Sequence, residues 1–348
     1  MPLPTARKRI TATLAALIGA TLVLAGCSNG TPSAEEDQGS AAVSGAFPAT
    51  IDTARGEITV EEKPERIIAL KPRHIELLHL LGEESFEYSA APFEDSESLL
   101  EFYPWLEGSF EGEPATNLIT ADNTPSPEAI AALDPDLILT NIWGADDQLY
   151  SQLSQIAPTY VGIDPDTQTS WQDELAALAT LTGHDSASVE EIKADYASEL
   201  AAAAERLPGL QGKTFQVAVL AGDNILQLSD YANEPLLGLG LEPGEGQPTT
   251  GVEGLTAPKF SLENVDQLTA DVLFIIPEKG TTPNTEFKEA LRSDPRVAEL
   301  PSAQNGTLIY LTPQEWTALN GGVSTSYLWW LDNAVPQLEE SALNQSSE

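Results

Sequence analysis

Basic residues are scarce in this sequence. Lys and Arg together number 16 against 54 Asp and Glu, which gives a formal net charge of −38 at pH 7. A protein that binds nucleic acid needs basic side chains to neutralise phosphates, so no nucleic-acid partner is expected. Such acidity is typical of a solvated, self-repelling surface. The alternative is a negative field that holds cationic ligands or steers partners.

Cysteine and histidine are scarce as well. The chain has one cysteine, Cys27, and three histidines, His74, His79 and His184. A single cysteine can form no intramolecular disulfide, so the fold must be stabilised by its core. His74 and His79 are five residues apart and do not share one face of a helix. We therefore expect packing or surface roles for the histidines, with no metal site and no resident cofactor.

Common catalytic motifs are missing too. The sequence has no G-x-S-x-G elbow, no H-E-x-x-H zinc motif and no glycine-rich loop of the kind that cradles phosphate. We therefore expect no enzyme, and an exported enzyme remains only a remote alternative.

The N-terminus has the pattern of an export signal. Arg7, Lys8 and Arg9 precede 15 uncharged, largely apolar residues, Ile10–Leu24. This stretch is shorter than the ~20 residues that span a bilayer as a helix. It leads into Ala25, Gly26 and Cys27, which resemble a bacterial lipoprotein cleavage site. We predict a signal peptide over 1–26 and a lipid on Cys27, on the extracytoplasmic face of the cell membrane. The alternative is an ordinary signal peptide with Cys27 incidental.

The next segment, residues 27–50, is rich in Ser, Gly, Ala and acidic residues and has no apolar periodicity. This composition is typical of a flexible tether. The folded part is therefore expected to start near residue 51.

A long helical pattern lies in the middle of the chain. Apolar residues recur at steps of three and four over Ser188–Leu207, and Pro208 and Gly209 end the run. Ser188 and Glu191 have the spacing of a capping box. About 20 residues at 1.5 Å each make a rod of roughly 30 Å, the width of a small domain. The pattern predicts one connecting helix over 187–208.

Two segments on either side of this helix repeat one another. Ser126–Leu139 and Ser261–Phe274 share Ser, Glu, Leu and Asp at matching places, 135 residues apart. Short apolar strands alternate with helices around both segments, which indicates an α/β fold with mainly parallel sheets. We predict two similar lobes, 51–186 and 209–348, joined by the connecting helix. Ligands of such sheets lie at the carboxyl ends of the strands, so a ligand cleft is expected between the lobes.

Together these features resemble the substrate-binding proteins of bacterial ABC importers. The resemblance is to the helical-backbone group (class III, periplasmic-binding-protein-like), which serves iron-siderophores, haem and vitamin B12. It covers about Gly56 to Leu338 and is strongest over Gly56–Gly82, Ser126–Asn141 and Asp294–Trp316. It implies a lipid-anchored protein that captures a ferric siderophore or similar iron chelate for an ABC permease. Haem or cobalamin is the alternative ligand, and a sensor or adhesin on this scaffold is a remote one.

In that family a carboxylate from each lobe docks on arginines of the permease. The matching positions here are Glu128 and Glu263, with Glu76 a weaker candidate. The alternative is that each acid only complements the dipole at the start of its helix.

The ligand pocket is expected where strands end. The candidates are Lys71, Arg73, Asn141 and Trp143 in the first lobe and Tyr231, Lys259 and Trp316 in the second. Tryptophan can stack on a ligand, and basic side chains can balance an anionic chelate. Because few basic residues surround the predicted mouth of the second lobe, the sequence favours a neutral or weakly cationic hydroxamate complex.

The lipid anchor gives the first testable prediction. Replacing Cys27 by Ala should leave an unprocessed precursor or release the protein into the medium, because the lipidation site is lost. Detergent-phase partitioning and the size of the processed chain measure this directly. Normal processing and unchanged partitioning of the variant would contradict the lipoprotein hypothesis.

Overall fold

A computed structural model describes residues 47–120, 122–164, 169–222, 225–230, 232–249, 257, 259–276, 285–320 and 322–345. All of them belong to one compact unit, residues 42–348. The predicted signal peptide, Cys27 and Tyr231 lie outside the described residues. In the described part of the chain, no helix combines the length and apolar character needed to cross a membrane.

The first lobe contains a four-stranded parallel sheet in the order β4-β3-β5-β6. Its strands are β3 (Ile67–Ala69), β4 (Phe86–Tyr88), β5 (Leu137–Leu139) and β6 (Thr159–Tyr160). The central strands β3 and β5 are wholly apolar and wholly buried, as expected for a parallel sheet covered on both faces. The helices of this lobe are α1 (Pro72–Leu80), α2 (Ser96–Phe102), η1 (Pro104–Leu106), α3 (Pro127–Ala131), α4 (Asp147–Leu153) and α5 (Trp171–Thr182).

A separate hairpin precedes this sheet. Strands β1 (Ala49–Thr53) and β2 (Gly56–Val60) pair antiparallel, and Gly56 has a positive φ of 106° where the turn enters β2. Glycine adopts this conformation without the steric cost that a side chain would add.

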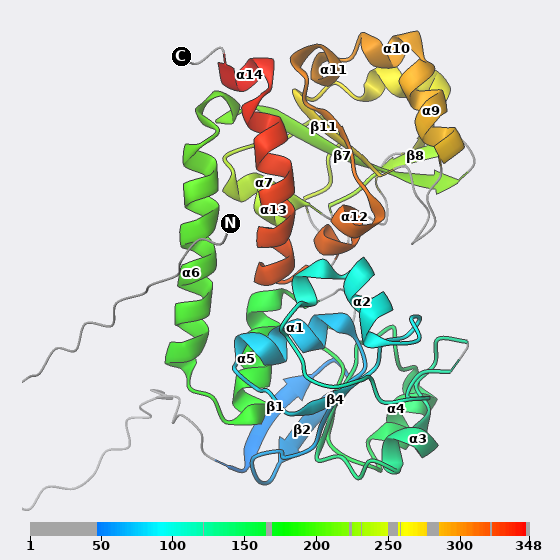
Figure 1. Cartoon of the computed structure of the whole chain (residues 1–348), viewed down its shortest axis with the longest axis vertical. Coiled ribbons are helices and arrows are strands. Elements are labelled where there is room, and N and C mark those ends of the chain that lie inside the picture. The colour runs from blue at the N-terminus through cyan, green and yellow to red at the C-terminus, as the bar shows by residue number, and fades with distance from the viewer. Residues whose placement is uncertain are drawn as a thin grey trace, which may run out of the picture. The chain divides into compact units, whose positions relative to one another are not determined.

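The second lobe contains a six-stranded sheet in the order β10-β8-β7-β11-β12, with β9 paired to β7. Its strands are β7 (Thr214–Gly222), β8 (Ile225–Leu228), β9 (Glu242–Pro243), β10 (Lys259–Ser261), β11 (Val272–Ile276) and β12 (Leu308–Tyr310). β7, β9, β11 and β12 are parallel, whereas β8 and β10 run antiparallel to their neighbours. The prediction of a mainly parallel α/β fold in two lobes is confirmed (Figure 1).

Among the described residues, the second lobe has more helices than the first. They are α7 (Asn233–Gly238), η3 (Leu262–Gln267), α9 (Thr285–Ser293), α10 (Pro295–Ala298), α11 (Pro301–Asn305), α12 (Pro313–Leu319), α13 (Ser324–Glu339) and α14 (Ala342–Gln345). A short 3₁₀ helix, η2 (Pro208–Leu210), leads into the lobe from the connecting helix.

The connecting helix α6 is one continuous helix of 20 residues, Ser186–Glu205. It begins one residue before the predicted start at 187 and ends three residues before the predicted end at 208. The predicted capping box is wrong. The cap is Asp185, whose side chain accepts a hydrogen bond from the Ser188 backbone N–H at 2.9 Å. Its buried face carries Val189, Tyr196 and Leu200 as the apolar period predicts, and α13 lies alongside it (Figure 1).

The repeated helix is less regular in the second lobe than the sequence predicts. Ser126 caps α3 by accepting from the Ala129 backbone N–H at 3.4 Å, whereas Ser261 makes no such bond. The second copy is a 3₁₀ helix, η3, interrupted by non-helical φ and ψ at Asn264. Asparagine side chains compete for backbone hydrogen bonds, which disfavours a regular α-helix over so short a segment.

Helix α1 carries several residues of the first lobe's strand ends. It starts at Pro72, with Lys71 at its N-cap position. Proline is favoured at the first helical position because its missing N–H would have no partner there. As a result, Arg73 and Glu76 lie on the same helix as His74.

The largest apolar cluster extends across both lobes. It includes Leu78 and Trp171 from the first lobe, Tyr196 from α6, and Phe274 and Trp330 from the second. The lobes are therefore held together by side-chain packing around α6 and α13 as well as by chain connection.

Candidate functional site

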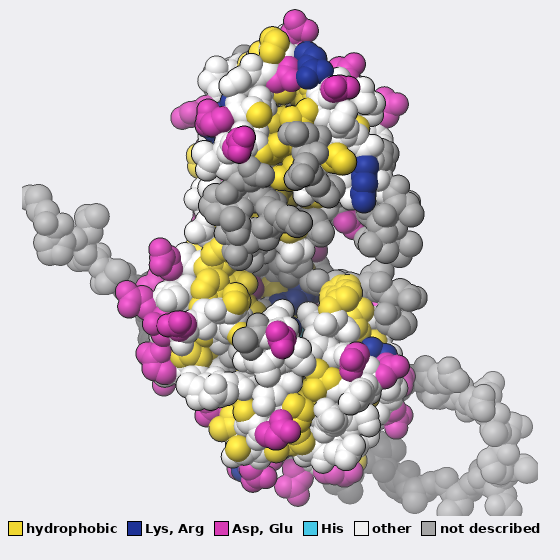
Figure 2. Space-filling model, turned by 90° about the vertical axis from the view of Figure 1, so that its right-hand side faces the viewer, with side chains coloured by type: hydrophobic (Ala, Val, Ile, Leu, Met, Phe, Trp, Pro, Cys, Tyr) yellow, Lys and Arg dark blue, Asp and Glu magenta, His cyan; other side chains and the backbone are white. Residues whose placement is uncertain are grey.

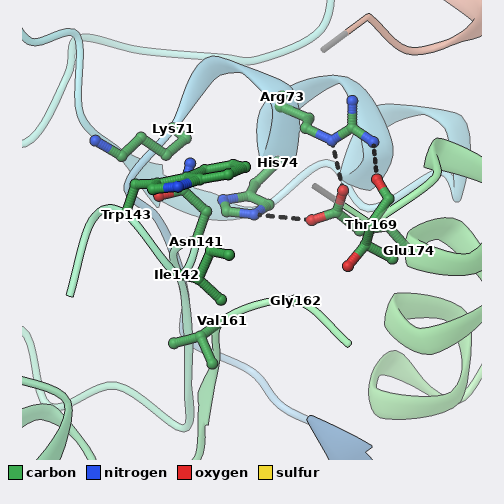
Figure 3. A pocket seen from close by; sticks show the side chains of 10 residues that line it. All are labelled: Lys71, Arg73, His74, Asn141, Ile142, Trp143, Val161, Gly162, Thr169 and Glu174. Carbon is green, nitrogen blue, oxygen red and sulfur yellow. Dashed lines mark hydrogen bonds and ion pairs between the residues drawn. The ribbon is translucent and has the colours of Figure 1, made fainter. Parts of the chain in front are cut away.

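A hollow of about 340 Å³, which includes space open to solvent, lies at the carboxyl ends of β3, β5 and β6 (Figure 3). This is where a parallel α/β sheet is expected to bind its ligand. Four predicted pocket residues are brought together there, namely Lys71, Arg73, Asn141 and Trp143. The full lining is Lys71, Arg73, His74, Asn141, Ile142, Trp143, Val161, Gly162, Thr169 and Glu174.

Trp143 lies at the mouth of the hollow on a tight turn that follows β5. Its side chain is 64% exposed, the highest value among the large apolar residues described. The turn is closed by the Gly144 N–H, which donates to the Asn141 carbonyl at 2.9 Å and to Asn141 Oδ1 at 2.7 Å. A Cβ at Gly144 would lie 2.6 Å from Thr140 Oγ1. Asn141 and Gly144 therefore fix the backbone of the turn that carries Trp143.

Lys71 lies beside Trp143 (Figure 3). Its Cε is 3.2 Å from the place that a Cβ of Gly144 would take, so its aliphatic stem passes over the same turn. Burial lowers the pKa of Lys71 from its ordinary value of 10.5. Among the described residues no carboxylate lies within ion-pair distance of Lys71.

Arg73, by contrast, already has several partners. Its Nε lies 2.5 Å from Glu174 Oε2, its Nη2 donates to the Thr169 carbonyl at 3.0 Å, and its Nη1 donates to the Gly322 carbonyl at 2.9 Å. The last contact reaches the second lobe just before α13. The Arg73 side chain lines the hollow, but its guanidinium is committed to protein contacts.

Glu174 completes this buried network. Its other oxygen, Oε1, lies 3.2 Å from Nε2 of His74, and both side chains are at most 5% exposed. Burial alone would raise the pKa of Glu174, but the charge of Arg73 and the contact with His74 outweigh it, so the pKa is lowered. His74 was expected at the surface or in packing. It is buried, in an edge-to-face contact with Tyr160.

Glu76 lies one turn further along α1 and also reaches the second lobe. Thr325 Oγ1 donates to Glu76 Oε2 at 2.6 Å. Burial raises the pKa of Glu76, and the hydrogen bond from Thr325 opposes the rise only in part. The weaker prediction that Glu76 contacts a permease is wrong, because its carboxyl group is buried in the protein.

We call the contacts Arg73–Gly322 and Glu76–Thr325 the α1–α13 latch. A ring contact supports the latch, since Trp105 of η1 and Trp329 of α13 have centroids 5.2 Å apart. The latch is a second connection between the lobes, independent of α6.

The predicted residues of the second lobe are not in the described lining of the hollow. Lys259 is exposed on strand β10, and Trp316 packs against the main apolar cluster from α12. The loops that follow β7 and β11, at 223–224 and 277–284, lie outside the described residues, as does Tyr231. Ligand contacts from this lobe stay predictions.

Glu128 and Glu263 are both exposed, in the first turns of α3 and η3. Within the described ranges neither carboxylate forms an ion pair. The backbone at Glu263 is fixed by Arg296, whose Nη1 donates to the Glu263 carbonyl at 2.7 Å. Their docking role stays a prediction.

Sequence reasoning missed Glu174, although a signal was present. Glu174 lies three residues after Trp171 and four before Leu178, on the apolar stripe of α5. An acid at a core position needs a buried partner, and this predicts an ion pair.

In the described part of the chain, no group of three or more His, Cys, Asp or Glu side chains could hold a metal ion.

Comparison with known proteins gives a consistent result. A family profile described as periplasmic binding protein matches residues 67–315. The ferric enterobactin-binding periplasmic protein FepB of Escherichia coli is 35% identical over 176 residues. That match spans 49% of this chain and 53% of FepB, about half of each. The probable siderophore-binding lipoprotein YfiY of Bacillus subtilis is 25% identical over 89% of this chain and 92% of its own length.

Solved structures share the fold. A periplasmic solute binding protein from Mycobacterium smegmatis has a TM-score of 0.67 and 22% identity, covering 83% of this chain and 97% of that one. PiaA of Streptococcus pneumoniae in complex with ferrichrome has a TM-score of 0.65 and 21% identity. It covers 85% of this chain and 99% of PiaA.

The raised pKa of buried Glu76 predicts the direction in which stability changes with pH. The folded state raises the pKa of Glu76 above 4.5, so the free energy of unfolding falls as pH rises from 4.5 through that raised pKa. Glu76→Gln removes this loss. It should be more stable than the wild type at pH 8, and the gain should shrink as the pH approaches 4.5. Urea denaturation at several pH values measures the difference.

Glu174→Gln is the matched control of opposite sign. The pKa of Glu174 is lowered, so its charge stabilises the fold above pH 4.5 and this contribution is lost on acidification through the folded pKa. The variant should be less stable than the wild type at pH 8, and the deficit should narrow in acid. Shifts in the same direction for both variants would contradict the assigned environments.

Proposed function

The chain belongs to the periplasmic binding protein family, and on this premise we propose that it captures a ferric siderophore or similar iron chelate outside the cytoplasm. It passes the ligand to an ABC permease. The observation that carries the proposal is the hollow at the strand ends, where exposed Trp143 lies beside Lys71. Indole and ammonium groups can contact the flat and charged parts of a chelate.

The comparisons support this choice of ligand. Of the relatives named above, FepB and YfiY carry names that refer to siderophore binding, and the PiaA structure contains ferrichrome. The names periplasmic protein and lipoprotein agree with a protein exported through residues 1–26 and tethered to the membrane by a lipid on Cys27. The activity is binding, and the iron belongs to the ligand.

Tryptophan fluorescence tests the proposal. Trp143 is exposed at the hollow, so a bound ferric complex should quench its emission in a saturable way. The panel contains ferric tris-catecholate, trihydroxamate and citrate complexes, with haem and cobalamin as the alternative ligands. Iron-free siderophores and a ferric salt are the controls. Saturable quenching by at least one ferric siderophore is expected. Saturation by haem or cobalamin alone, or by nothing in the panel, would contradict the proposal.

We propose further that Glu128 and Glu263 dock on the permease. Replacing both by Ala should abolish uptake while ligand affinity and melting temperature stay nearly unchanged, because both side chains are exposed. Losing a paired interface charge can cost a few kcal/mol of binding free energy. At either position alone, charge reversal should therefore reduce uptake more than Ala does. Uptake by the intact transporter, together with binding by the purified protein, measures both effects.

Glu191→Ala with Glu199→Ala on α6 is the matched control, since both acids are exposed and the change in net charge is the same. This control should transport normally. Normal transport by the Glu128 and Glu263 variant, or loss of ligand binding in it, would contradict the docking role.

A further inference from the structure

We propose that Lys71 and Trp143 select an aryl iron chelate, one whose aromatic rings carry ionised oxygens, as in catecholate or phenolate siderophores. The proposal rests on the proposed function and names the class of ligand that the site takes. It differs from the sequence-based preference for a neutral or weakly cationic hydroxamate complex.

Trp143 offers an aromatic surface to a ligand. The residue is 64% exposed, and its backbone is held by the turn that Asn141 and Gly144 close. An exposed indole on such a turn can stack on a planar ring, and only its side-chain torsions have to be ordered when the ligand binds. An aliphatic hydroxamate or citrate arm offers no ring for such a contact.

The charge inside the hollow favours an anionic ligand. Glu174 is the one carboxylate among its described lining residues, and it is already paired with Arg73 and His74. Lys71 is the cation left without a carboxylate partner among those residues. The described lining is therefore locally positive, although the whole chain is strongly negative.

The acidic surface does not cancel this local charge. Figure 2 shows Asp and Glu side chains spread over both lobes on the face in view, with few Lys or Arg. Exposed charges further away than the Debye length, about 8 Å at physiological salt, are largely screened. The electrostatic energy of an anionic group beside Lys71 therefore depends mainly on the ammonium and its immediate surroundings.

The relative position of Lys71 and Trp143 lets one ligand contact both. Lys71 and Trp143 lie side by side at the mouth of the hollow (Figure 3). A ring stacked on the indole therefore brings an oxygen on its edge to the ammonium. A neutral chelate gains no binding free energy from charge pairing with Lys71, and an aliphatic anion gains none from ring stacking on Trp143. An aryl oxyanion gains binding free energy from both contacts.

Isothermal titration calorimetry separates these contributions. Three probes are used: a ferric tris-catecholate, a neutral ferric trihydroxamate with aliphatic arms, and ferric citrate. The wild type should bind the tris-catecholate most tightly. Trp143→Leu should weaken the tris-catecholate alone, by about 3- to 10-fold. Lys71→Met should weaken the tris-catecholate and citrate by about 10-fold or more and leave the trihydroxamate unchanged. A ferric phenolate complex serves as an additional probe. In every variant its affinity should change in the same way as that of the tris-catecholate.

Lys63→Met is the matched control, because it removes one exposed cation that does not line the described hollow and has no predicted ligand contact. It should leave the affinity for all three probes unchanged. Unchanged melting temperatures of the Lys71 and Trp143 variants confirm that both are folded.

The outcomes distinguish the inference from the proposed function. Tightest binding of the trihydroxamate, or equal weakening of all three probes by either variant, overturns the inference and leaves siderophore binding standing. Binding of none of the ferric complexes overturns the proposed function itself.

Discussion

The buried ion pair between Arg73 and Glu174 is the interaction on which the rest of the site depends. Removing one partner of such a pair typically costs about 3–5 kcal/mol, because the other charge is left buried and uncompensated. The pair fixes α1 against α5, and α1 carries Lys71 at its N-cap position. The position of the ammonium at the mouth of the hollow therefore follows from a contact deeper in the lobe.

The same helix also connects the two lobes. Arg73 and Glu76 reach the start of α13 through Gly322 and Thr325, and the Trp105–Trp329 contact lies beside them. Together with the unbroken helix α6, these contacts oppose large rearrangement of the described lobes. A large hinge motion would have to break buried hydrogen bonds to charged groups, whereas small adjustments would not.

Net charge and local charge lead to different conclusions about the ligand. The acidity of the chain, with few basic residues near the predicted mouth of the second lobe, favours a neutral or weakly cationic chelate. Folding gathers Lys71, Arg73 and Glu174 into one hollow, and the pairing of Arg73 with Glu174 leaves Lys71 as the charge that a ligand meets.

The sequence alone determined what depends on local pattern. Apolar periodicity predicted α6, the alternation of short apolar strands with helices predicted the mainly parallel sheets, and the strand ends predicted that Lys71, Asn141 and Trp143 share a pocket wall. Only the tertiary structure decided which charges are buried and paired. Arg73 meets Glu174 across 101 residues, and Glu76 meets Thr325 across 249. Periodicity within one element carries no information about partners so far apart, because their approach depends on how whole lobes pack.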